Sequence, residues 1–311
     1  AEGNFERGYS TLQLLKDPRD PERWSRVRQQ LFEARSSRVR PERDDKIVAA
    51  WNGLLISPLV EAAIVLNEPT WLDAALEAAE LIWTVHRAGT SDFTRTSLDG
   101  VAAQNSATLE DLALVASAFQ SLFSVTGDIV WWERAESLLA RIRNEFVDPK
   151  GGFFDTAADA EVLIARPQDF ADNASPCGNS AALAAFLTQS AITGDPAAID
   201  QTDKSLARLV PLMESAPRFA GWALAQAEAY LAGPMQIAIV GTSGSELHRT
   251  AINQAALGTV IVVAEADTDV PLFTDRGKTN GQDTAYVCHN FTCRLPVTSA
   301  EDLAQQLQGN A

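Results

Sequence analysis

Residues 125–132 read Val-Thr-Gly-Asp-Ile-Val-Trp-Trp, and a related turn occurs on either side of them in the chain. The two related turns are residues 66–72 (Leu-Asn-Glu-Pro-Thr-Trp-Leu) and residues 192–196 (Ile-Thr-Gly-Asp-Pro). Each turn follows an Ala/Leu-rich stretch and precedes another, and the acidic residue recurs after 60 positions (68 to 128) and then after 67 (128 to 195). Because this period matches two helices with their connection, the sequence predicts repeated helical hairpins.

The residues of these turns are suited to end one helix and begin the next. Gly127 and Gly194 suit the left-handed residue that follows a helix, while Asp128 and Asp195 can cap the helix that comes after. Pro69 suits a first helical position. We therefore expect three consecutive hairpins, formed by helices at 47–66 and 69–88, 108–126 and 128–146, and 177–193 and 196–214.

Further helices are expected on both sides of these hairpins, at 21–38 and 217–232. Together they predict a mainly α fold in which residues 1–233 form a portion of an α/α-toroid. The connections 89–105 and 149–174 are too long to be simple turns. In the second, 151–155 followed by 161–164 is typical of a short β-hairpin, and 92–96 predicts a shorter equivalent in the first.

The hydrophobic period changes at residue 234. A buried strand is expected at 235–240, a helix at 246–257 and a second strand at 259–263, which gives a βαβ-like unit. A last strand at 284–288 and a terminal helix at 301–308 follow. Residues 234–311 are therefore predicted to form a small α/β subdomain.

The composition, the net charge and the number of cysteines argue against several classes of protein. The chain has 311 residues, 46% of them hydrophobic, a formal net charge of -16 and three cysteines. No apolar run reaches the roughly 18 residues of a membrane span, and the negative charge opposes binding to nucleic acid. An odd, small number of cysteines and a start without a secretory signal favour the cytoplasm. No metal or other cofactor is expected.

In a toroid of hairpins the first helix of each pair lines the interior, so polar residues that precede those helices meet at one mouth. The candidate catalytic residues are carboxylates that act as general acid and base: Asp45, Glu110, Asp111 and Asp172. The candidate substrate-binding residues add charge, amides and a stacking ring for a small carbohydrate: Arg43, Lys46, Trp51, Asn52 and Asn179.

Each of these residues also has a structural interpretation. Asp44 and Thr108 are natural N-caps, and Thr108 with Asp111 approaches a capping box. Trp51 alone is more often a core residue, and Asn179 can simply bridge neighbouring helices. Recurrence at one end of three successive inner helices is what favours a functional site.

Other polar residues give weaker signals. His86 suits a positive partner at a helix carboxyl end, and His248 lies on the predicted βαβ helix. The loop 241–245 resembles a phosphate-binding turn without the full fingerprint. Cys288 and Cys293 are expected to be buried structural thiols, while Cys177, just before an inner helix, is a candidate nucleophile.

The chain resembles the thioredoxin-domain-containing proteins related to spermatogenesis-associated protein 20, with bacterial YyaL-type members. The resemblance covers nearly the whole chain. The matching stretches are 3–6 (Gly-Asn-Phe-Glu), 40–46 (Arg-Pro-x-Arg-Asp-Asp-Lys), 51–54 (Trp-Asn-Gly-Leu), 109–111 (Leu-Glu-Asp), 151–155 (Gly-Gly-Phe-Phe-Asp), 176–180 (Pro-x-Gly-Asn-Ser) and 284–293 (Thr-Ala-Tyr-Val-Cys-x-Asn-Phe-x-Cys).

The resemblance implies an N-terminal thioredoxin-like domain followed by a six-hairpin toroid similar to N-acylglucosamine 2-epimerases and related glycosidases. This chain then corresponds to a C-terminal portion, without the thioredoxin-like domain and with about half of the hairpins. It departs from the family pattern at Cys177, where serine is usual, and it lacks the mouth histidines of the epimerases. Exposed apolar faces of an incomplete ring favour a homo-oligomer or a covering segment.

Two functions from different classes follow from these observations. The first is a carbohydrate-binding or carbohydrate-active site at the toroid mouth. The second is a non-catalytic scaffold that presents a thioredoxin-like domain or a protein partner, with the polar motifs fixing the beginnings of helices. A third, redox function requires reactive thiols.

Overall fold

The computed structural model describes residues 3–88, 92–161, 164–233, 235–265 and 268–308. It divides into two compact units, Ala1–Asp45 and Lys46–Ala311, which are described separately. The smaller unit contains a short 3-10 turn, Glu6–Gly8, and the helix α1, Pro21–Ser36. Asp20 caps α1 by accepting a hydrogen bond from Arg23 N, so the helix predicted at 21–38 is confirmed. The predicted subdomain boundary at 233/234 stays a prediction.

The three predicted hairpins are confirmed in the larger unit. Gly127 and Gly194 follow their helices with φ of 67° and 66°. Asp128 and Asp195 cap the next helices by accepting from Val130 N and Ala197 N. The helices are α2 (Ala49–Val65) and α3 (Pro69–Val85), α4 (Leu109–Thr126) and α5 (Ile129–Glu145), α6 (Gly178–Thr193) and α7 (Pro196–Ser215), followed by α8 (Gly221–Ala232).

These helices form an inner and an outer layer. α2, α4, α6 and α8 contact one another in that order, while α3, α5 and α7 each pack on the inner helix that precedes them. α4 and α6 are apolar around most of their circumference. Their large side chains Phe119, Phe123 and Phe186 are fully buried. A helix that is apolar on all sides must lie inside the fold. The chain is therefore mainly helical, arranged as a portion of an α/α-toroid.

The inner helices α2 and α4 approach each other closely at Gly53. A Cβ added at this glycine would lie 2.7 Å from both the carbonyl carbon and the carbonyl oxygen of Leu114, and 2.8 Å from the amide nitrogen of Val115. All three atoms belong to the backbone of α4. The absence of a side chain at Gly53 is therefore what lets the two helices touch.

The first long connection contains β-strands, as predicted, whereas the described part of the second contains none. The first holds two small antiparallel sheets: β2 (Arg87–Ala88) pairs with β3 (Asp92–Phe93), and β4 (Thr96–Leu98) pairs with β5 (Val101–Ala102) and with β1 (Ile47–Val48). The first strand of the β-hairpin predicted at 151–155 and 161–164 does not form. The described part of this loop holds only an isolated bridge between Val147 and Phe153, and residues 162–163 lie outside the described residues.

The C-terminal part contains a sheet with strand order β7-β6-β8-β9. β6 and β7 are parallel and joined by α9, so the predicted βαβ unit is confirmed, although α9 ends three residues before the expected position. β8 and β9 continue the sheet in the antiparallel sense. The elements are β6 (Met235–Val240), α9 (Glu246–Gln254), β7 (Val260–Ala264), β8 (Thr284–His289), β9 (Thr292–Cys293) and the terminal helix α10 (Ala300–Gln308).

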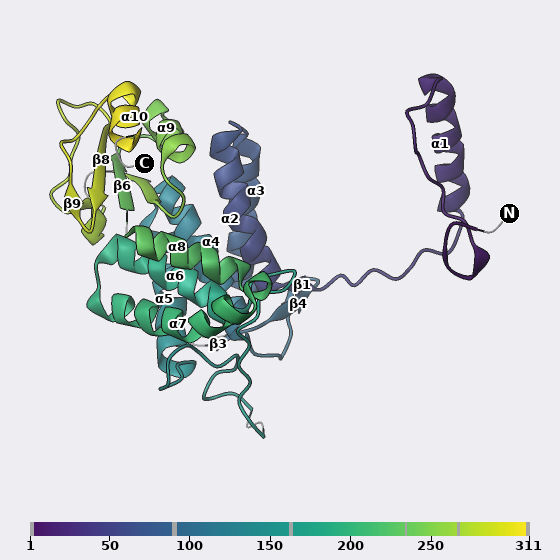
Figure 1. The fold of residues 1–311 in the computed structure, drawn as a ribbon, viewed down its shortest axis with the longest axis horizontal. Coiled ribbons are helices and arrows are strands. Elements are labelled where there is room, and N and C mark those ends of the chain that lie inside the picture. Colours follow the sequence, from purple (N-terminus) through teal and green to yellow (C-terminus); the bar gives the residue numbers. More distant parts are fainter. Residues whose placement is uncertain (1–2, 89–91, 162–163, 234, 266–267, 309–311) are drawn as a thin grey trace. The chain divides into compact units, whose positions relative to one another are not determined.

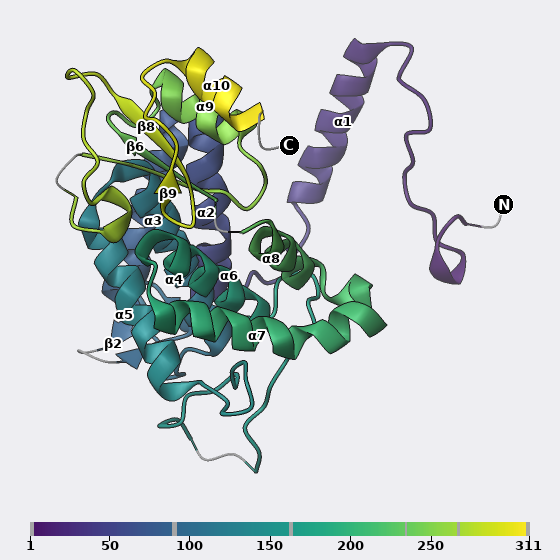
Figure 2. The same ribbon diagram turned by 60° about the vertical axis from the view of Figure 1, so that its left-hand side comes forward.

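This sheet packs on the carboxyl ends of the inner helices. Val240 and Val262 belong to the same buried cluster as Phe119 of α4. Gly127, which ends α4, lies so close to β7 that a Cβ there would be 2.9 Å from Ala264 Cα. Within the larger unit, Figures 1 and 2 show the sheet with α9 and α10 at one end of the helices and the long loop 149–174 at the opposite end.

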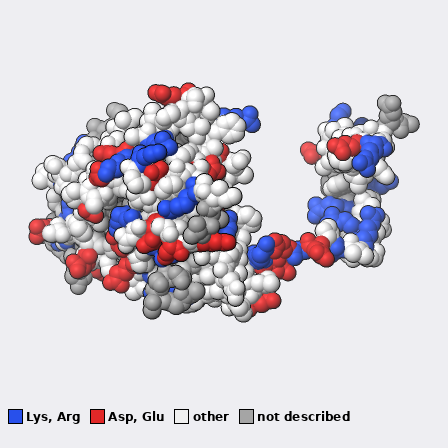
Figure 3. Space-filling model, turned by 90° about the horizontal axis from the view of Figure 1, so that it is seen from below, with Lys and Arg blue, Asp and Glu red and all other residues white. Residues whose placement is uncertain are grey.

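The charged surface and the limited apolar length of the helices agree with the amino-acid composition. Figure 3 shows Asp and Glu side chains interspersed with Lys and Arg over the visible face of the larger unit. Within the described residues, no helix is both long enough and apolar enough to cross a lipid bilayer.

Candidate functional site

The amino ends of the inner helices meet at one end of the larger unit. The link between α2 and α4 is a hydrogen bond from Ala50 N to Asp111 Oδ1 of 3.1 Å. α4 and α6 touch at Gly178, where an added Cβ would lie 3.1 Å from Glu110 N. Asp172 accepts hydrogen bonds from the first turns of both α6 and α8. The predicted convergence of helix beginnings is therefore present in the structure for α2, α4, α6 and α8.

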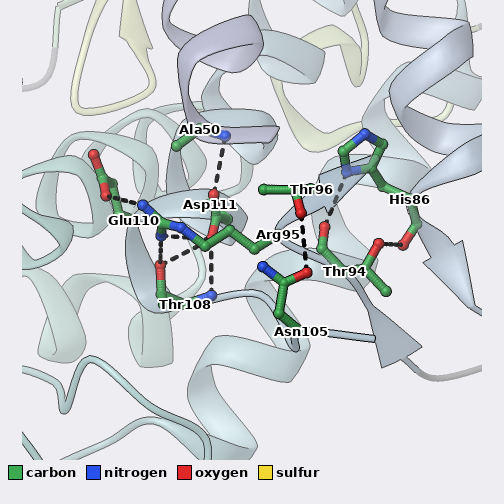
Figure 4. A network of polar contacts seen from close by, with 9 residues as sticks. All are labelled: Ala50, His86, Thr94, Arg95, Thr96, Asn105, Thr108, Glu110 and Asp111. Atoms are coloured by element: carbon green, nitrogen blue, oxygen red, sulfur yellow. Dashed lines mark hydrogen bonds and ion pairs between the residues drawn. The ribbon is translucent and has the colours of Figure 1, made fainter. Parts of the chain in front are cut away.

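Asp111 lies at the centre of this arrangement and is fully buried. Its Oδ2 accepts from Thr108 N and Thr108 Oγ1, both at 2.9 Å, and from Arg95 Nη1 at 3.0 Å. Together with the bond from Ala50 N, these contacts engage both carboxylate oxygens (Figure 4). Asp111 therefore joins two helices and a loop.

Glu110 occupies the neighbouring position but keeps part of its carboxylate exposed, with a side-chain exposure of 23%. Its Oε2 lies 3.6 Å from Arg95 Nη2, and it also hydrogen-bonds the side chain of Ser175. Burial raises the pKa of this carboxyl, the charge of Arg95 opposes that rise and the charge of Asp111 adds to it. A carboxyl with a raised pKa that solvent still reaches is the type of group that donates and accepts protons in catalysis.

Asp172 and Asn179 hold backbone at the next helices. Asp172 Oδ1 accepts from Cys177 N, and its Oδ2 accepts from the backbone N–H groups of Trp222 and Ala223. Asn179 accepts from Phe153 N and donates to the carbonyl oxygens of Phe153 and Asp169. Asn179 thus joins α6 to the loop 149–174 rather than to a neighbouring helix. Its predicted role in substrate binding and the catalytic role of Asp172 stay predictions.

Two tryptophans project from the amino ends of the inner helices. Trp51, in the first turn of α2, is 63% exposed, and Trp222, the second residue of α8, is 39% exposed. Trp51 is thus a surface residue, which is contrary to the alternative interpretation of a core position, while its predicted role in substrate binding stays a prediction. Asn52 is fixed locally, because its Nδ2 donates to the carbonyl oxygen of Val48. Flat exposed rings beside a polar cluster are suited to stack on sugar rings.

The remaining predicted residues lie before α2. Arg43 and Asp45 belong to the smaller unit, where their side chains form an ion pair. Lys46 is exposed and begins the larger unit. The expectation that Asp44 caps α2 is wrong, because the helix starts later and Val48 occupies the N-cap position. The roles predicted for Arg43, Asp45 and Lys46 stay predictions.

Three residues at this end of the fold were not predicted from the sequence as parts of the site. Arg95 reaches Glu110 and Asp111 from the loop between β3 and β4. Asp155, whose pKa is raised by burial, lies beside the first turn of α4 because its carbonyl oxygen accepts from Leu109 N. The third residue is Trp222. Asp155 stood in the stretch 151–155 and Arg95 in the stretch 92–96, both of which were singled out as predicted β-structure rather than as parts of a site.

His86 differs from its predicted role, whereas His248 lies on α9, the helix of the βαβ unit, as predicted. His86 is fully buried, with Nδ1 3.0 Å from the carbonyl oxygen of Thr94 and Nε2 2.9 Å from Ser97 Oγ (Figure 4 shows the contact to Thr94). Burial lowers its pKa, so the expected positive partner of a helix dipole is wrong. His248 accepts from Gly244 N through Nδ1, and burial lowers its pKa to about 4.

The glycine-rich loop 241–245 has acidic surroundings that disfavour phosphate. Thr242 N already donates to Asp283 Oδ2. The hollow beside this loop is lined by Asp283, Glu246 and Glu301. Within the ranges that the structure describes, no group of three or more His, Cys, Asp or Glu residues is placed to hold a metal ion.

The cysteines require two corrections. Cys288 and Cys293 are not free thiols but form a disulfide between β8 and β9. Cys177 is the N-cap of α6 and accepts from Ser180 N, as expected from its position, but burial raises its pKa to about 11. The nucleophilic role suggested for Cys177 therefore has no support from its ionisation.

We expect Cys177 to resist alkylation in the native protein. At pH 8, a thiol with a pKa of about 11 is thiolate in roughly one molecule in a thousand. Iodoacetamide labelling followed by mass spectrometry should leave Cys177 unmodified in native protein and modify it readily in guanidinium chloride. Native labelling at the rate of an exposed cysteine would contradict the burial of this side chain.

The fold and site together define a mainly helical toroid portion with a small C-terminal sheet. No protein-family model matches the chain. It is distantly homologous to spermatogenesis-associated protein 20. The human protein is 26% identical over 303 residues and the Mus musculus protein 24% over 303 residues, in each case covering 90% of this chain. The chain spans 38% of the length of these relatives.

Similar solved structures are epimerases and glycoside hydrolases. A sugar epimerase from a ruminal bacterium aligns with a TM-score of 0.45 and 15% identity, over 56% of this chain and 46% of that one. A family 76 α-mannanase of Bacteroides thetaiotaomicron aligns with a TM-score of 0.44 and 13% identity, over 60% of this chain and 55% of that one.

Proposed function

We propose that the end of the toroid where the inner helices begin is a carbohydrate-active site, with Glu110 as its acid–base residue. The observation that supports this most directly is the environment of Glu110. Its carboxyl is partly exposed, has a raised pKa and is held between Arg95 and Ser175. A protonated carboxyl in such a place can deliver a proton to a leaving oxygen.

Trp51 and Trp222 supply the second part of the proposal. Both rings are exposed on first turns of inner helices whose amino ends Asp111 and Asp172 hold in place. Sugar binding needs a flat apolar face next to polar groups, and this end of the fold offers both. Asp155 is the second carboxyl with a raised pKa here and is the residue we propose as partner of Glu110.

In this proposal Asp111 and Asp172 position the site rather than react. Their oxygens are engaged by backbone N–H groups and, for Asp111, by Arg95. The candidate residues Arg43, Asp45 and Lys46 stay predicted contributors from the chain before α2. Cytoplasmic location, self-association and a covering segment likewise stay predictions.

The test is a titration of mono- and disaccharides by calorimetry, with turnover followed by NMR. We expect Trp51→Ala to weaken sugar binding about tenfold, since aromatic contacts contribute on the order of 1 kcal/mol. Glu110→Gln should keep binding and lower turnover by about 10²–10⁴-fold. Trp71→Ala is the matched control, because this partly exposed tryptophan lies on the outer helix α3.

The pH dependence has a defined sign. Because the pKa of Glu110 is raised, its acid form persists to higher pH than that of an ordinary glutamate. Turnover that depends on the protonated carboxyl is lost as the pH rises through this raised pKa. Glu110→Gln should remove this decrease from the alkaline side of the pH–rate profile. Silence of the whole sugar panel, with the variants folded, would reject the proposal.

A non-catalytic scaffold is the second candidate. The observation that favours it is that Asp111, Asp172 and Asn179 all hold backbone groups. A scaffold predicts that replacements at this end change stability alone, and that no sugar binds. The titration above separates the two functions, because only the first gives heat with the native protein.

A further inference from the structure

The disulfide between Cys288 and Cys293 lies at an edge of the C-terminal sheet. β9, which carries Cys293, is the last strand in the order β7-β6-β8-β9. Cys288 is 1% exposed, whereas Cys293 is only partly buried. An external thiolate therefore reaches the sulfur of Cys293 first, and the sulfur of Cys288 is the one that leaves.

The hairpin needs little help from a covalent link. Cys288 and Cys293 are directly opposite each other, and the turn at Asn290 and Phe291 has φ of 48° and 61°, as two-residue hairpin turns require. The cysteines are five positions apart. Because the entropy gained by closing so short a loop is small, stabilisation alone is a weak reason for this disulfide.

A guanidinium group faces both sulfur atoms. Arg276 Nη2 lies 2.9 Å from Cys293 Sγ and 3.7 Å from Cys288 Sγ. Its Nη1 donates to the carbonyl oxygens of Leu272, at 2.6 Å, and Thr274, at 3.3 Å. The guanidinium is thus held in place by backbone and turned toward the sulfurs. The other ionisable groups that act on it are Tyr286 and Asp275.

A cation in this position suits a thiolate better than a disulfide. The sulfurs of a disulfide are weak hydrogen-bond acceptors, whereas a thiolate carries a full negative charge that a neighbouring arginine stabilises. The contact therefore shifts the equilibrium between disulfide and dithiol toward the dithiol, relative to the same hairpin without the arginine. It also lowers the barrier for the sulfur that leaves as a thiolate.

We propose that Cys288 and Cys293 form a thiol–disulfide exchange centre that a dithiol reductant opens, with Arg276 holding the thiolates of both cysteines as they are released in turn. The inference is independent of the carbohydrate site.

The exchange proceeds in two steps. A thiolate of the dithiol attacks Cys293 Sγ, a mixed disulfide forms, and Cys288 leaves with the electron pair as a thiolate that accepts a hydrogen bond from Arg276. The second thiol of the reductant, once deprotonated, attacks its own sulfur in the mixed disulfide and releases Cys293. The dithiol is oxidised by two electrons to its disulfide, the cysteine pair is reduced, and the two protons lost by the reductant balance the two thiols formed.

The test uses the full chain in buffers of reduced and oxidised dithiothreitol, quenched by alkylation and read by mass spectrometry. We expect native protein to exchange Cys288 and Cys293 reversibly while Cys177 stays unlabelled as an internal control. In the reduced protein, the alkylation profile of Cys293 should show a pKa below the roughly 8.5 of a free cysteine. Arg276→Gln should raise that pKa by about one unit and shift the equilibrium with dithiothreitol about tenfold toward the disulfide.

Arg276→Lys keeps a positive charge and should restore part of both effects, which a loss of packing alone would not. A native pair that dithiothreitol reduces only after unfolding would overturn the proposal. An ordinary or raised pKa for Cys293 in the reduced native protein would overturn it as well, and this measurement needs no variant. Identical pH profiles for Arg276→Gln and the native protein would also overturn it, because the guanidinium would then have no effect on the thiolate.

Discussion

Asp111→Ala should lower the free energy of unfolding by about 3–5 kcal/mol, the range for removing one partner of a buried ion pair. The side chain is fully buried and accepts hydrogen bonds from Ala50 N, Thr108 N, Thr108 Oγ1 and Arg95 Nη1. Its loss leaves Ala50 N and Thr108 N without this acceptor and removes the buried carboxylate from Arg95, which keeps only its contacts with Thr108 Oγ1 and Glu110. Urea unfolding followed by circular dichroism measures the change.

An ordinary helix cap provides the comparison for this variant. Asp128 caps α5 by accepting from Val130 N in an exposed position, so Asp128→Ala should cost only about 1 kcal/mol. Equal effects of the two substitutions would mean that Asp111 does no more than cap α4. The bridge to α2 would then contribute nothing measurable.

Gly53→Ala should destabilise the protein by about 3 kcal/mol, at the upper end of the range for overpacking. In a solvent-exposed helix this change would raise the free energy of unfolding by up to about 1 kcal/mol, because alanine is the better helix former. Here the new methyl group would lie 2.7 Å from backbone atoms of Leu114. Backbone of a buried helix cannot move aside like the end of a flexible side chain, so α2 and α4 must separate.

The same unfolding experiment with Gly221→Ala is the matched control. Gly221 is also helical, in the first turn of α8, and nothing lies within 4 Å of an added Cβ. This variant should therefore be neutral or slightly more stable. A neutral Gly53→Ala would contradict the close approach of the two inner helices.

The helical repeat is predictable from sequence because its signals are local. Gly127 and Asp128 lie next to each other, and the same pair recurs at Gly194 and Asp195, so each turn carries its own helix end and helix beginning. The loop 149–174 is different. Its glycines suggest a β-hairpin, but its backbone is held by distant groups such as Asn179, which bonds Phe153 across 26 residues.

The candidate site is only partly encoded in local sequence. That Asp111 and Asp172 meet at one end follows from the repeat. Which group each carboxylate binds does not, because Ala50 and Trp222 lie 61 and 50 residues away from them. Arg95 was missed for the same reason, since an arginine in a loop shows its partners only in three dimensions. The disulfide between Cys288 and Cys293 depends on strand register, which an unusual cysteine spacing does not reveal.

The C-terminal sheet lies at the carboxyl ends of the inner helices, where the negative ends of the helix dipoles are. Gly127 meets β7 there, and Gly194 meets the ring of Phe291, so the partial negative charges of these helix ends lie against protein. At the other end, the carboxylates of Asp111 and Asp172 offset the partial positive charges of α2, α6 and α8, because they accept hydrogen bonds from N–H groups at the beginnings of these helices. Recognition of a ligand at that end therefore depends on side chains such as Arg95 and Glu110 rather than on free helix dipoles.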